Sequence, residues 1–319
     1  MRNRAIQLAT ILLLPIVLFM IFTLSAKGFG LHSIPIILSQ SMLPTVMAFG
    51  MCMIMNTGPM DFSVGARSIF AAVMGGLLAQ RMGAFGMVIG CLAGGIIGAV
   101  MMAILYDRLK IPAMVISLGV IMIYEVLGAK IAGSSGYIRI NSNIYSLMSY
   151  PNNLMLSFVA GIICYIVMYR TKIGSNMIAV GNDELMCKNV GINPARIKLM
   201  AFILSGVFTS IAGILLLCYS GSVSASTGMA SMSTVFKPLM CILIARQLRN
   251  TMDNMPLLIL IGGICLTIIF NGFIALGFSD ALQDVTLGLF MIVLMSHSGN
   301  AKALKEWRRR RKIARVLAS

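Results

Sequence analysis

The sequence predicts an all-α polytopic membrane protein with about ten transmembrane helices, several of them broken, joined by short connections. The chain has 319 residues, of which 59% are hydrophobic and 11% charged, with a mean hydropathy of +0.94. A water-soluble domain carries about a quarter charged residues. The apolar runs are continuous and lack the alternation of apolar and polar residues that is typical of barrel strands.

The apolar runs fit the length of about 20 residues that a helix needs to cross a bilayer. The first run follows Arg2 and Arg4 and resembles a signal peptide, but no small-residue cleavage site follows it, so we expect an uncleaved helix. We expect residues 1–300 to form one transmembrane domain and residues 301–319 a basic cytoplasmic tail. The predicted spans are residues 5–26, 35–56, 62–80, 84–106, 112–133, 153–169, 198–219, 234–246, 255–275 and 281–296.

Basic residues gather in every second connection, which indicates the orientation in the membrane. The long segment 169–198 and the tail fall on one side, whereas the connections on the other side carry only Lys27, Arg81 and Arg139. We therefore expect a multi-pass protein of the bacterial inner membrane with both termini in the cytoplasm. The net charge of +16 then indicates contact with anionic membrane lipid, above all at the tail, and not with nucleic acid.

The stretch NTGPMDFSVGARS, residues 56–68, interrupts two apolar runs with a carboxylate. Gly58 and Pro59 predict a break in the helix, after which Asp61 can accept hydrogen bonds from the free N–H groups of residues 63 and 64. We therefore expect Asp61 to cap a restarted helix, and asparagine to replace it with little effect. Contact with a solute is a second role for Asp61.

Polar residues inside the spans predict a path for a solute. Gln40 and Ser41 precede Pro44 by about one turn, and broken helices beside polar side chains are typical of transporters. A carboxylate such as Glu125 is costly inside a span unless it faces the bundle interior or water. Each residue alone could instead form a hydrogen bond that joins two neighbouring helices. Together they predict an uncharged, hydroxyl-rich solute, and the predicted path comprises Gln40, Ser41, Asn56, Asp61, Glu125, Asn271 and Gln283.

Two connections have patterns of their own. On the cytoplasmic side, Asn182 or Asp183 is placed to cap a short helix in DELMCKN, Gly191 stands where that helix ends, and Asn193-Pro194 begins the next. The alternative is an ordinary surface loop. On the outer side, the small polar residues 220–233 predict either a re-entrant segment or a flexible loop.

The sequence has no pattern that predicts an enzyme. It contains no nucleophile–base pair, no metal-ligand cluster and no GxxxxGK[ST] loop, so we expect no cofactor, no metal and no ATP bound by this chain itself. The seven cysteines form no CxxC pair and are read as small apolar packing residues. His32 and His297 stand at span ends, where packing is the simpler interpretation.

Four segments resemble the permease subunits of ribose-type ABC importers, over nearly the whole chain. TGPMDFSVGA resembles the D-[LF]-S-V-G motif of that family, and IPAMVISLGVIMIYEVLG its P-P-F-[IV]-x-T-L-G segment. The run RTKIGSNMIAVGNDELMCKNVGINPARIKLMAFILSGVFTSIAGIL is the most specific match, and FNGFIALGFSDALQDVTLGLFMIVL resembles the N-G…L-G-x-S…Q…G segment. Residues 231–252 lack the G-G-T-S-x-x-G-G motif of the family, and Glu125 replaces a basic residue, which indicates a diverged member.

The resemblance implies an importer that moves a simple sugar such as ribose by alternating access, driven by separate cytoplasmic ATPases. It also implies an extracytoplasmic solute-binding protein and a second permease copy or paralogue. The cytoplasmic helix would be a coupling helix that docks on the ATPase through Asp183, Glu184, Leu185, Met186, Val190 and Gly191. The alternatives are a permease for nucleosides, branched amino acids or another polar solute, an ion-coupled secondary carrier, and a membrane scaffold that transports nothing.

Overall fold

The computed structural model describes residues 4–26, 28–141, 143–145, 150–225, 227–249, 251–279, 282–283, 285–293 and 296. Helices dominate this part of the chain. They are α1 (Arg4–Ser25), α2 (Ile34–Met55), α3 (Val64–Leu109), α4 (Ala113–Ala132), α6 (Asn152–Arg170), α7 (Lys172–Asn182), α8 (Glu184–Asn189), α9 (Pro194–Ser220), α10 (Phe236–Leu248) and α11 (Met255–Ala275), with short 3-10 helices η1 (Leu31–Ser33), η2 (Gly133–Ser135) and η3 (Ala230–Val235). The strands are β1 (Tyr137–Arg139) and β2 (Ser222–Ser224).

Seven helices of the described residues are long and apolar enough to cross a membrane, and the predicted all-α polytopic fold is confirmed. One of them, α3, contains two of the predicted spans. It turns back at Gly83, whose φ of 65° and ψ of −148° suit glycine alone. A Cβ on Gly90 would lie 2.6 Å from the carbonyl oxygen of Met74, so the two arms of α3 pack closely against each other.

Two predicted spans differ from full crossings. The helix α10 has 13 residues, shorter than the roughly 20 that cross a bilayer. The last predicted span, 281–296, is only partly among the described residues, which are helical at 285–293. The count of ten crossings therefore stays a prediction, and the tail 301–319 lies outside the described residues.

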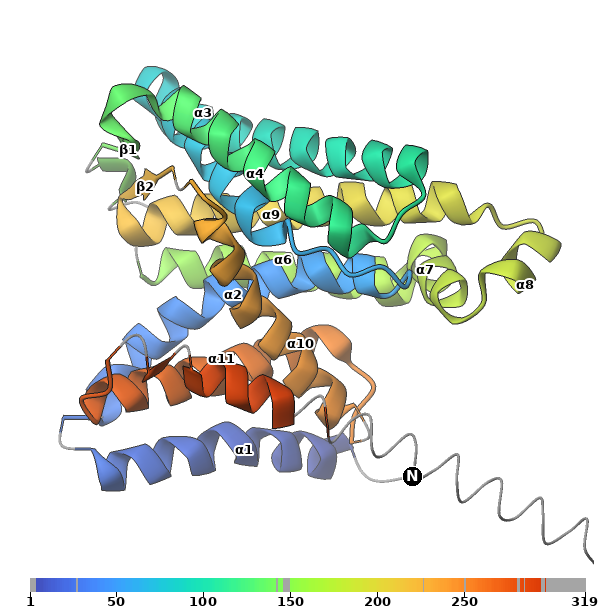
Figure 1. Cartoon of the computed structure of the whole chain (residues 1–319). Helices are drawn as coiled ribbons and strands as arrows, with labels where there is room; N and C mark the ends of the chain where they lie inside the picture. Colours follow the sequence, from blue (N-terminus) through green and yellow to red (C-terminus); the bar gives the residue numbers. More distant parts are fainter. Residues whose placement is uncertain are drawn as a thin grey trace, which may run out of the picture.

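The helices form two groups with α2 running between them (Figure 1). One group contains α3, α4, α6 and α9, and the other contains α1, α10 and α11. Helix α2 contacts α9 and α6 of the first group and α10 and α11 of the second. It continues through Pro44 as one helix, and the helix breaks lie at residues 56–63, as Gly58 and Pro59 predicted, and before α10.

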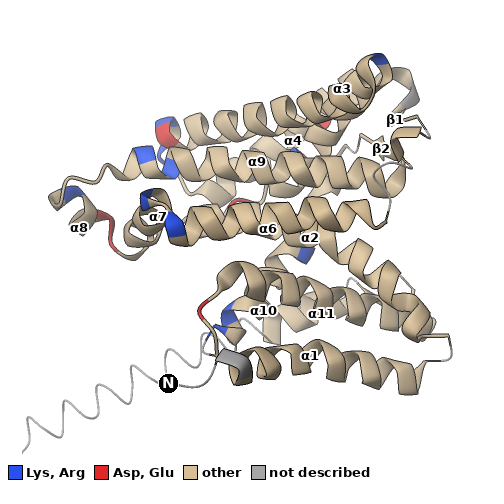
Figure 2. Ribbon diagram, turned by 180° about the vertical axis from the view of Figure 1, so that it is seen from behind, with Lys and Arg blue, Asp and Glu red and all other residues tan. Residues whose placement is uncertain are grey.

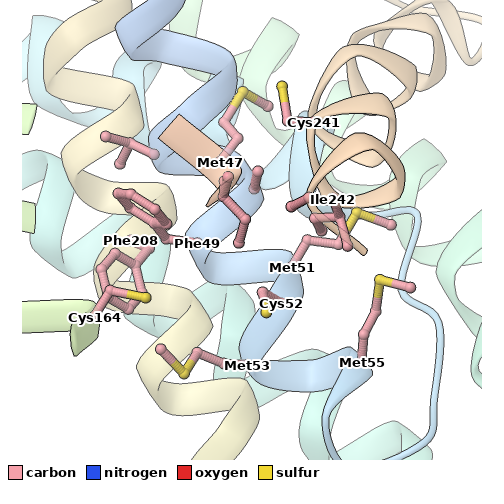
Figure 3. Packing of buried hydrophobic residues seen from close by; sticks show 14 of the residues in the cluster. Met47, Phe49, Met51, Cys52, Met53, Met55, Cys164, Phe208, Cys241 and Ile242 are labelled. Atoms are coloured by element: carbon pink, nitrogen blue, oxygen red, sulfur yellow. The ribbon is translucent and has the colours of Figure 1, made fainter. Parts of the chain in front are cut away.

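The core around α2 is rich in methionine (Figure 3). Met47, Met51 and Met53 are buried, and the rings of Phe49 and Phe208 meet edge to face with centroids 6.0 Å apart. The unbranched methionine side chain fills the irregular space between helices that cross at different angles. All seven cysteines are buried and free, which confirms their predicted packing role.

The described residues of segment 220–233 form β2 and the start of η3 and pack against the bundle. Strand β2 pairs antiparallel with β1, with Val223 opposite Ile138, and η3 follows with Ser231 and Val235 buried. A Cβ on Gly65, at the start of α3, would overlap the side chain of Thr234 in η3. The described residues of this segment thus favour the re-entrant interpretation over the flexible loop.

Charged residues lie mainly at the ends of the helices (Figure 2). Lys and Arg gather at the end that carries α7 and α8, and fewer lie at the opposite end, near β1 and β2. The two ends of the bundle therefore differ in the charge that they present.

Candidate functional site

A cavity of about 330 Å³ lies where α2, α9, α10 and α11 meet, toward the end of the bundle that carries β1 and β2. It brings together Gln40, Asn271 and Gln283, three of the predicted path residues, from separate parts of the chain. Its wall consists of Ser39, Gln40, Leu43, Pro44, Tyr219, Lys237, Leu266, Thr267, Phe270, Asn271, Ile274 and Gln283.

A chain of hydrogen bonds runs along one wall of this cavity. The Asn271 amide donates to Gln40 Oε1 at 2.7 Å and to the carbonyl oxygen of Thr267 at 3.0 Å. Gln40 Nε2 in turn donates to the Tyr219 hydroxyl at 2.8 Å. An amide has two donor hydrogens and a carbonyl acceptor, so this arrangement leaves the Tyr219 hydrogen, one Gln40 hydrogen and Asn271 Oδ1 for a solute.

Among the wall residues that sequence reasoning missed, Tyr219 and Lys237 bring a phenol and an ammonium group to the cavity. Tyr219 stands at the end of α9, where a tyrosine resembles an interfacial anchor. Lys237 lies in the segment that departs from the motif of the resembled family, and no pattern placed its side chain in the cavity. The departure from the family motif was the signal that could have identified Lys237, because it places a charged residue in an otherwise apolar run.

The other predicted path residues lie away from the cavity. Ser41 is fully buried, and its hydroxyl donates to the carbonyl oxygen of Leu38 at 2.8 Å. Asn56 ends α2, and its amide contacts Cys52 Sγ at 3.8 Å. Neither residue lines the cavity. Their predicted role in solute passage is therefore not supported by their position in this structure.

Asp61 forms a buried ion pair with Arg67, and both side chains are 0% exposed. Asp61 Oδ2 lies 3.2 Å from Arg67 Nη2, which also donates to the Ser205 hydroxyl of α9 at 2.9 Å. Asp61 Oδ1 accepts from the N–H of Ser63 at 2.8 Å and from its hydroxyl at 2.6 Å.

The predicted capping role of Asp61 is therefore correct in part. The N–H of Ser63 donates to Asp61, but Ser63 itself is the N-cap of α3, and the N–H of Val64 does not donate to Asp61. Asp61 also pairs with Arg67, one turn into the helix. Arg67 is visible in the sequence, but capping rules do not predict that it pairs with Asp61. An uncompensated charge in this fully enclosed position would be strongly destabilising.

Glu125 holds the re-entrant segment in place. Its carboxylate accepts from the N–H of Met229 at 2.7 Å, and from the N–H and hydroxyl of Ser231 at 2.8 and 2.6 Å. The side chain is buried, as the cost of an exposed carboxylate in a span predicts. Because both oxygens are bound by the backbone before and within η3, the geometry supports a structural role more than contact with a solute.

The short helix predicted in DELMCKN is present as α8, Glu184–Asn189. Asp183 is its N-cap and accepts from the N–H groups of Leu185 and Met186 at 2.9 and 3.0 Å. Gly191 follows with φ of 83°, and Asn193 caps α9 by accepting from Ala195 and Arg196. These caps confirm the predicted boundaries of both helices.

The apolar side chains of α8 face solvent in the isolated chain. Leu185, Met186 and Val190 are 73%, 64% and 74% exposed. Glu184 forms an ion pair with Lys198 of α9 at 2.7 Å, which ties the short helix to a long one. Leu185 and Met186 of α8 and its C-cap Val190 thus present three exposed apolar side chains in a short stretch.

Sequence reasoning missed α7, which precedes α8. Thr171 caps it by accepting from Gly174 N–H at 3.3 Å, and Met177 and Val180 are buried. A Cβ on Gly181 would overlap the carbonyl oxygen of Asn56, so α7 packs directly on the end of α2. The spacing of Ile173, Met177 and Val180 at i, i+4 and i+7 was the signal that could have found this helix.

Comparison with known proteins agrees with this architecture. Residues 33–295 match the model of a family described as branched-chain amino acid transport system / permease component. The chain belongs to this permease family. Its motifs, read above as those of ABC importer permeases, are confirmed at the family level, and the chain is a multi-pass membrane protein.

Two curated relatives carry the name autoinducer 2 import system permease protein LsrC. The protein from Yersinia enterocolitica serotype O:8 is 27% identical over 209 residues, which cover 63% of this chain and 57% of the relative. The protein from Salmonella typhi is 26% identical over 230 residues, covering 69% of this chain and 65% of the relative. The match thus spans less than two thirds of the length of these relatives.

Proposed function

We propose that this permease forms the translocation path of an ATP-binding-cassette importer for a small, hydroxyl-rich solute of the simple-sugar class, such as ribose or a related monosaccharide. The observation that carries the proposal is the cavity lined by Gln40, Tyr219 and Asn271. It has amide and phenol groups in a fixed network, and such groups pair with sugar hydroxyls in both directions. The LsrC relatives, named for the import of autoinducer 2, support an importer of a small polar solute.

An ion-coupled carrier fits the buried carboxylates less well. Among the described residues, the buried acidic side chains are Asp61 and Glu125. Asp61 is paired with Arg67, and Glu125 is bound by backbone and hydroxyl donors. A coupling site needs an acidic group that is free to exchange a proton or ion, and these two are engaged in holding the fold together.

We further propose that α8 docks on a cytoplasmic ATPase, with ATP bound by that subunit. Its exposed Leu185, Met186 and Val190 would enter an apolar groove, while Asp183 and Gly191 fix the helix ends. Contact with α7 and α9 would pass the movement of the ATPase to the spans. The concentration of basic residues at this end supports its cytoplasmic placement in a bacterial inner membrane, by the positive-inside rule.

The remaining partners follow from the same scheme. An extracytoplasmic binding protein would deliver the solute at the β1–β2 end, where the cavity lies. A second permease, identical or paralogous, would complete the path. A nucleoside or another polar solute is the alternative within transport.

Uptake of radiolabelled monosaccharides by cells with and without the gene tests this function. We expect gene-dependent uptake that vanadate abolishes and a proton uncoupler does not, because ATP hydrolysis drives the cycle. Gln40→Leu should reduce that uptake, since it breaks the chain between Asn271 and Tyr219. Gln7→Leu on α1, outside the cavity, is the matched control and should leave it unchanged. Uptake that the uncoupler stops and vanadate does not would contradict the proposal.

A further inference from the structure

Building on the proposed transport function, we infer that the solute carries an anionic oxygen group, such as a carboxylate or phosphate on a hydroxylated carbon chain, and that Lys237 binds it. The sequence predicted an uncharged solute because the recognised polar residues were amides, a hydroxyl and two carboxylates. The structure places those carboxylates elsewhere and puts a lysine in the cavity wall instead.

Lys237 faces the cavity with its ammonium group unpaired. It is the second residue of α10 and is exposed, and Nζ lies 5.0 Å from the ring centroid of Phe270 on α11. Among the described residues, no hydrogen bond or ion pair is formed by this ammonium. The ring holds the cation by a cation–π contact and leaves its N–H donors for a ligand in the cavity.

The other described residues of the wall do not balance this charge. The residues that line the cavity include no carboxylate in the described part of the chain. The Tyr219 hydroxyl and one Gln40 hydrogen add donors on the neighbouring helices, and Asn271 Oδ1 remains as an acceptor. The described part of the wall is rich in donors and carries the charge of Lys237, and this combination favours a solute with anionic oxygens at one end and hydroxyls at the other.

Apart from the Phe270 ring, the described surroundings of Lys237 offer its charge little support. A cation in the first turn of a helix opposes the helix dipole, which favours acidic residues there. The neighbouring wall residues Leu43, Leu266 and Ile274 are apolar, so an unpaired charge among them is unfavourable without a ligand or water. Charged residues in such places within membrane proteins usually mark a substrate or ion pathway.

Thermal unfolding of the purified full-length chain in lipid nanodiscs tests this inference. The probes are gluconate, glucose 6-phosphate and their neutral parent glucose, each titrated at an ionic strength matched with sodium chloride. We expect an anionic probe to stabilise the wild-type protein at a concentration about tenfold or more below that of glucose, because hydrogen bonds to a charged group are stronger than neutral ones. Comparing gluconate with glucose 6-phosphate separates a carboxylate from a phosphate.

Three variants locate the effect. Lys237→Met should abolish the preference, whereas Lys237→Arg, which keeps the charge, should retain it. Lys130→Met removes an exposed lysine of α4 that does not line the cavity, and should leave the preference unchanged. The inference is overturned if glucose and both anions stabilise the protein equally, or if neither anion shifts the melting temperature. It is also overturned if Lys237→Met keeps the preference, or if inorganic phosphate alone gives the same shift as the sugar anions.

The outcome is separable from that of the transport proposal. Vanadate-sensitive uptake of neutral sugars without any preference for the anionic probes would overturn the anion inference alone. Binding of an anionic probe that depends on Lys237, in a protein whose uptake resists vanadate, would overturn ATP-driven import and leave the anion site in place.

Discussion

Replacing Asp61 by asparagine separates an ion pair from a helix cap. Asparagine keeps an oxygen that can accept from the N–H and hydroxyl of Ser63, so an Asp61 that served only as a cap would be replaced at little cost. It removes the negative charge that lies 3.2 Å from Arg67 Nη2 in a site where both side chains are 0% exposed. We therefore expect Asp61→Asn to destabilise the protein.

The size of the effect follows from burial. Removing one partner of a buried ion pair costs about 3–5 kcal/mol, because the remaining charge is left without compensation. Arg67 has little alternative support, since its Nε and Nη1 atoms already lack partners among the described residues and its remaining bond goes to the Ser205 hydroxyl. On this scale the melting temperature should fall by roughly 5–10 °C.

The assay is thermal unfolding in detergent, followed by the amount of protein that stays monodisperse. Asp61→Asn combined with Arg67→Met should recover most of the loss, because both charges are then removed together. Asp253→Asn is the matched control. It breaks the exposed pair with Arg249, whose side chains are 58% and 68% exposed, and should cost about 0–1 kcal/mol. If Asp61→Asn melts like the wild type, or the double variant is less stable than either single variant, the ion-pair argument is wrong.

Three further changes test other parts of the structure. Met186→Arg, in the exposed face of α8, should leave membrane insertion intact but abolish co-purification with the ATPase or uncouple hydrolysis from uptake. Ser175→Arg, on the exposed surface of α7, should change neither co-purification nor coupling. Full assembly and transport in Met186→Arg would make α8 an ordinary connection. Glu125→Gln should lower stability by about 2–3 kcal/mol and increase hydrogen exchange at η3, since a neutral amide accepts less strongly than a carboxylate; unchanged exchange would contradict the anchoring role. Gly181→Ala should reduce uptake without loss of expression, because its methyl group would push α7 off the end of α2, and normal uptake would show that this contact is not needed.

The segment from Asp183 to Pro194 shows what local sequence can predict. The ends of α8 and the start of α9 follow from Asp183, Gly191 and Asn193-Pro194, because capping depends on side chains that reach the backbone only two or three residues away. The turn inside α3 was likewise predicted between two apolar runs, where Gly83 adopts a conformation that other residues avoid. Each of these features is encoded within a few residues, so no knowledge of distant parts of the chain was required.

The sequence by itself determined the membrane class, the helical spans and the permease family, because hydrophobic length, charge placement and motif spacing are properties of the linear chain. Only the tertiary structure decided which polar residues meet. It joined Gln40 to Asn271 and Tyr219, bound Glu125 to a segment about a hundred residues away and turned Lys237 toward the cavity. The physical reason is that a buried polar group must find a partner, and which partner it finds depends on how helices far apart in the sequence pack together.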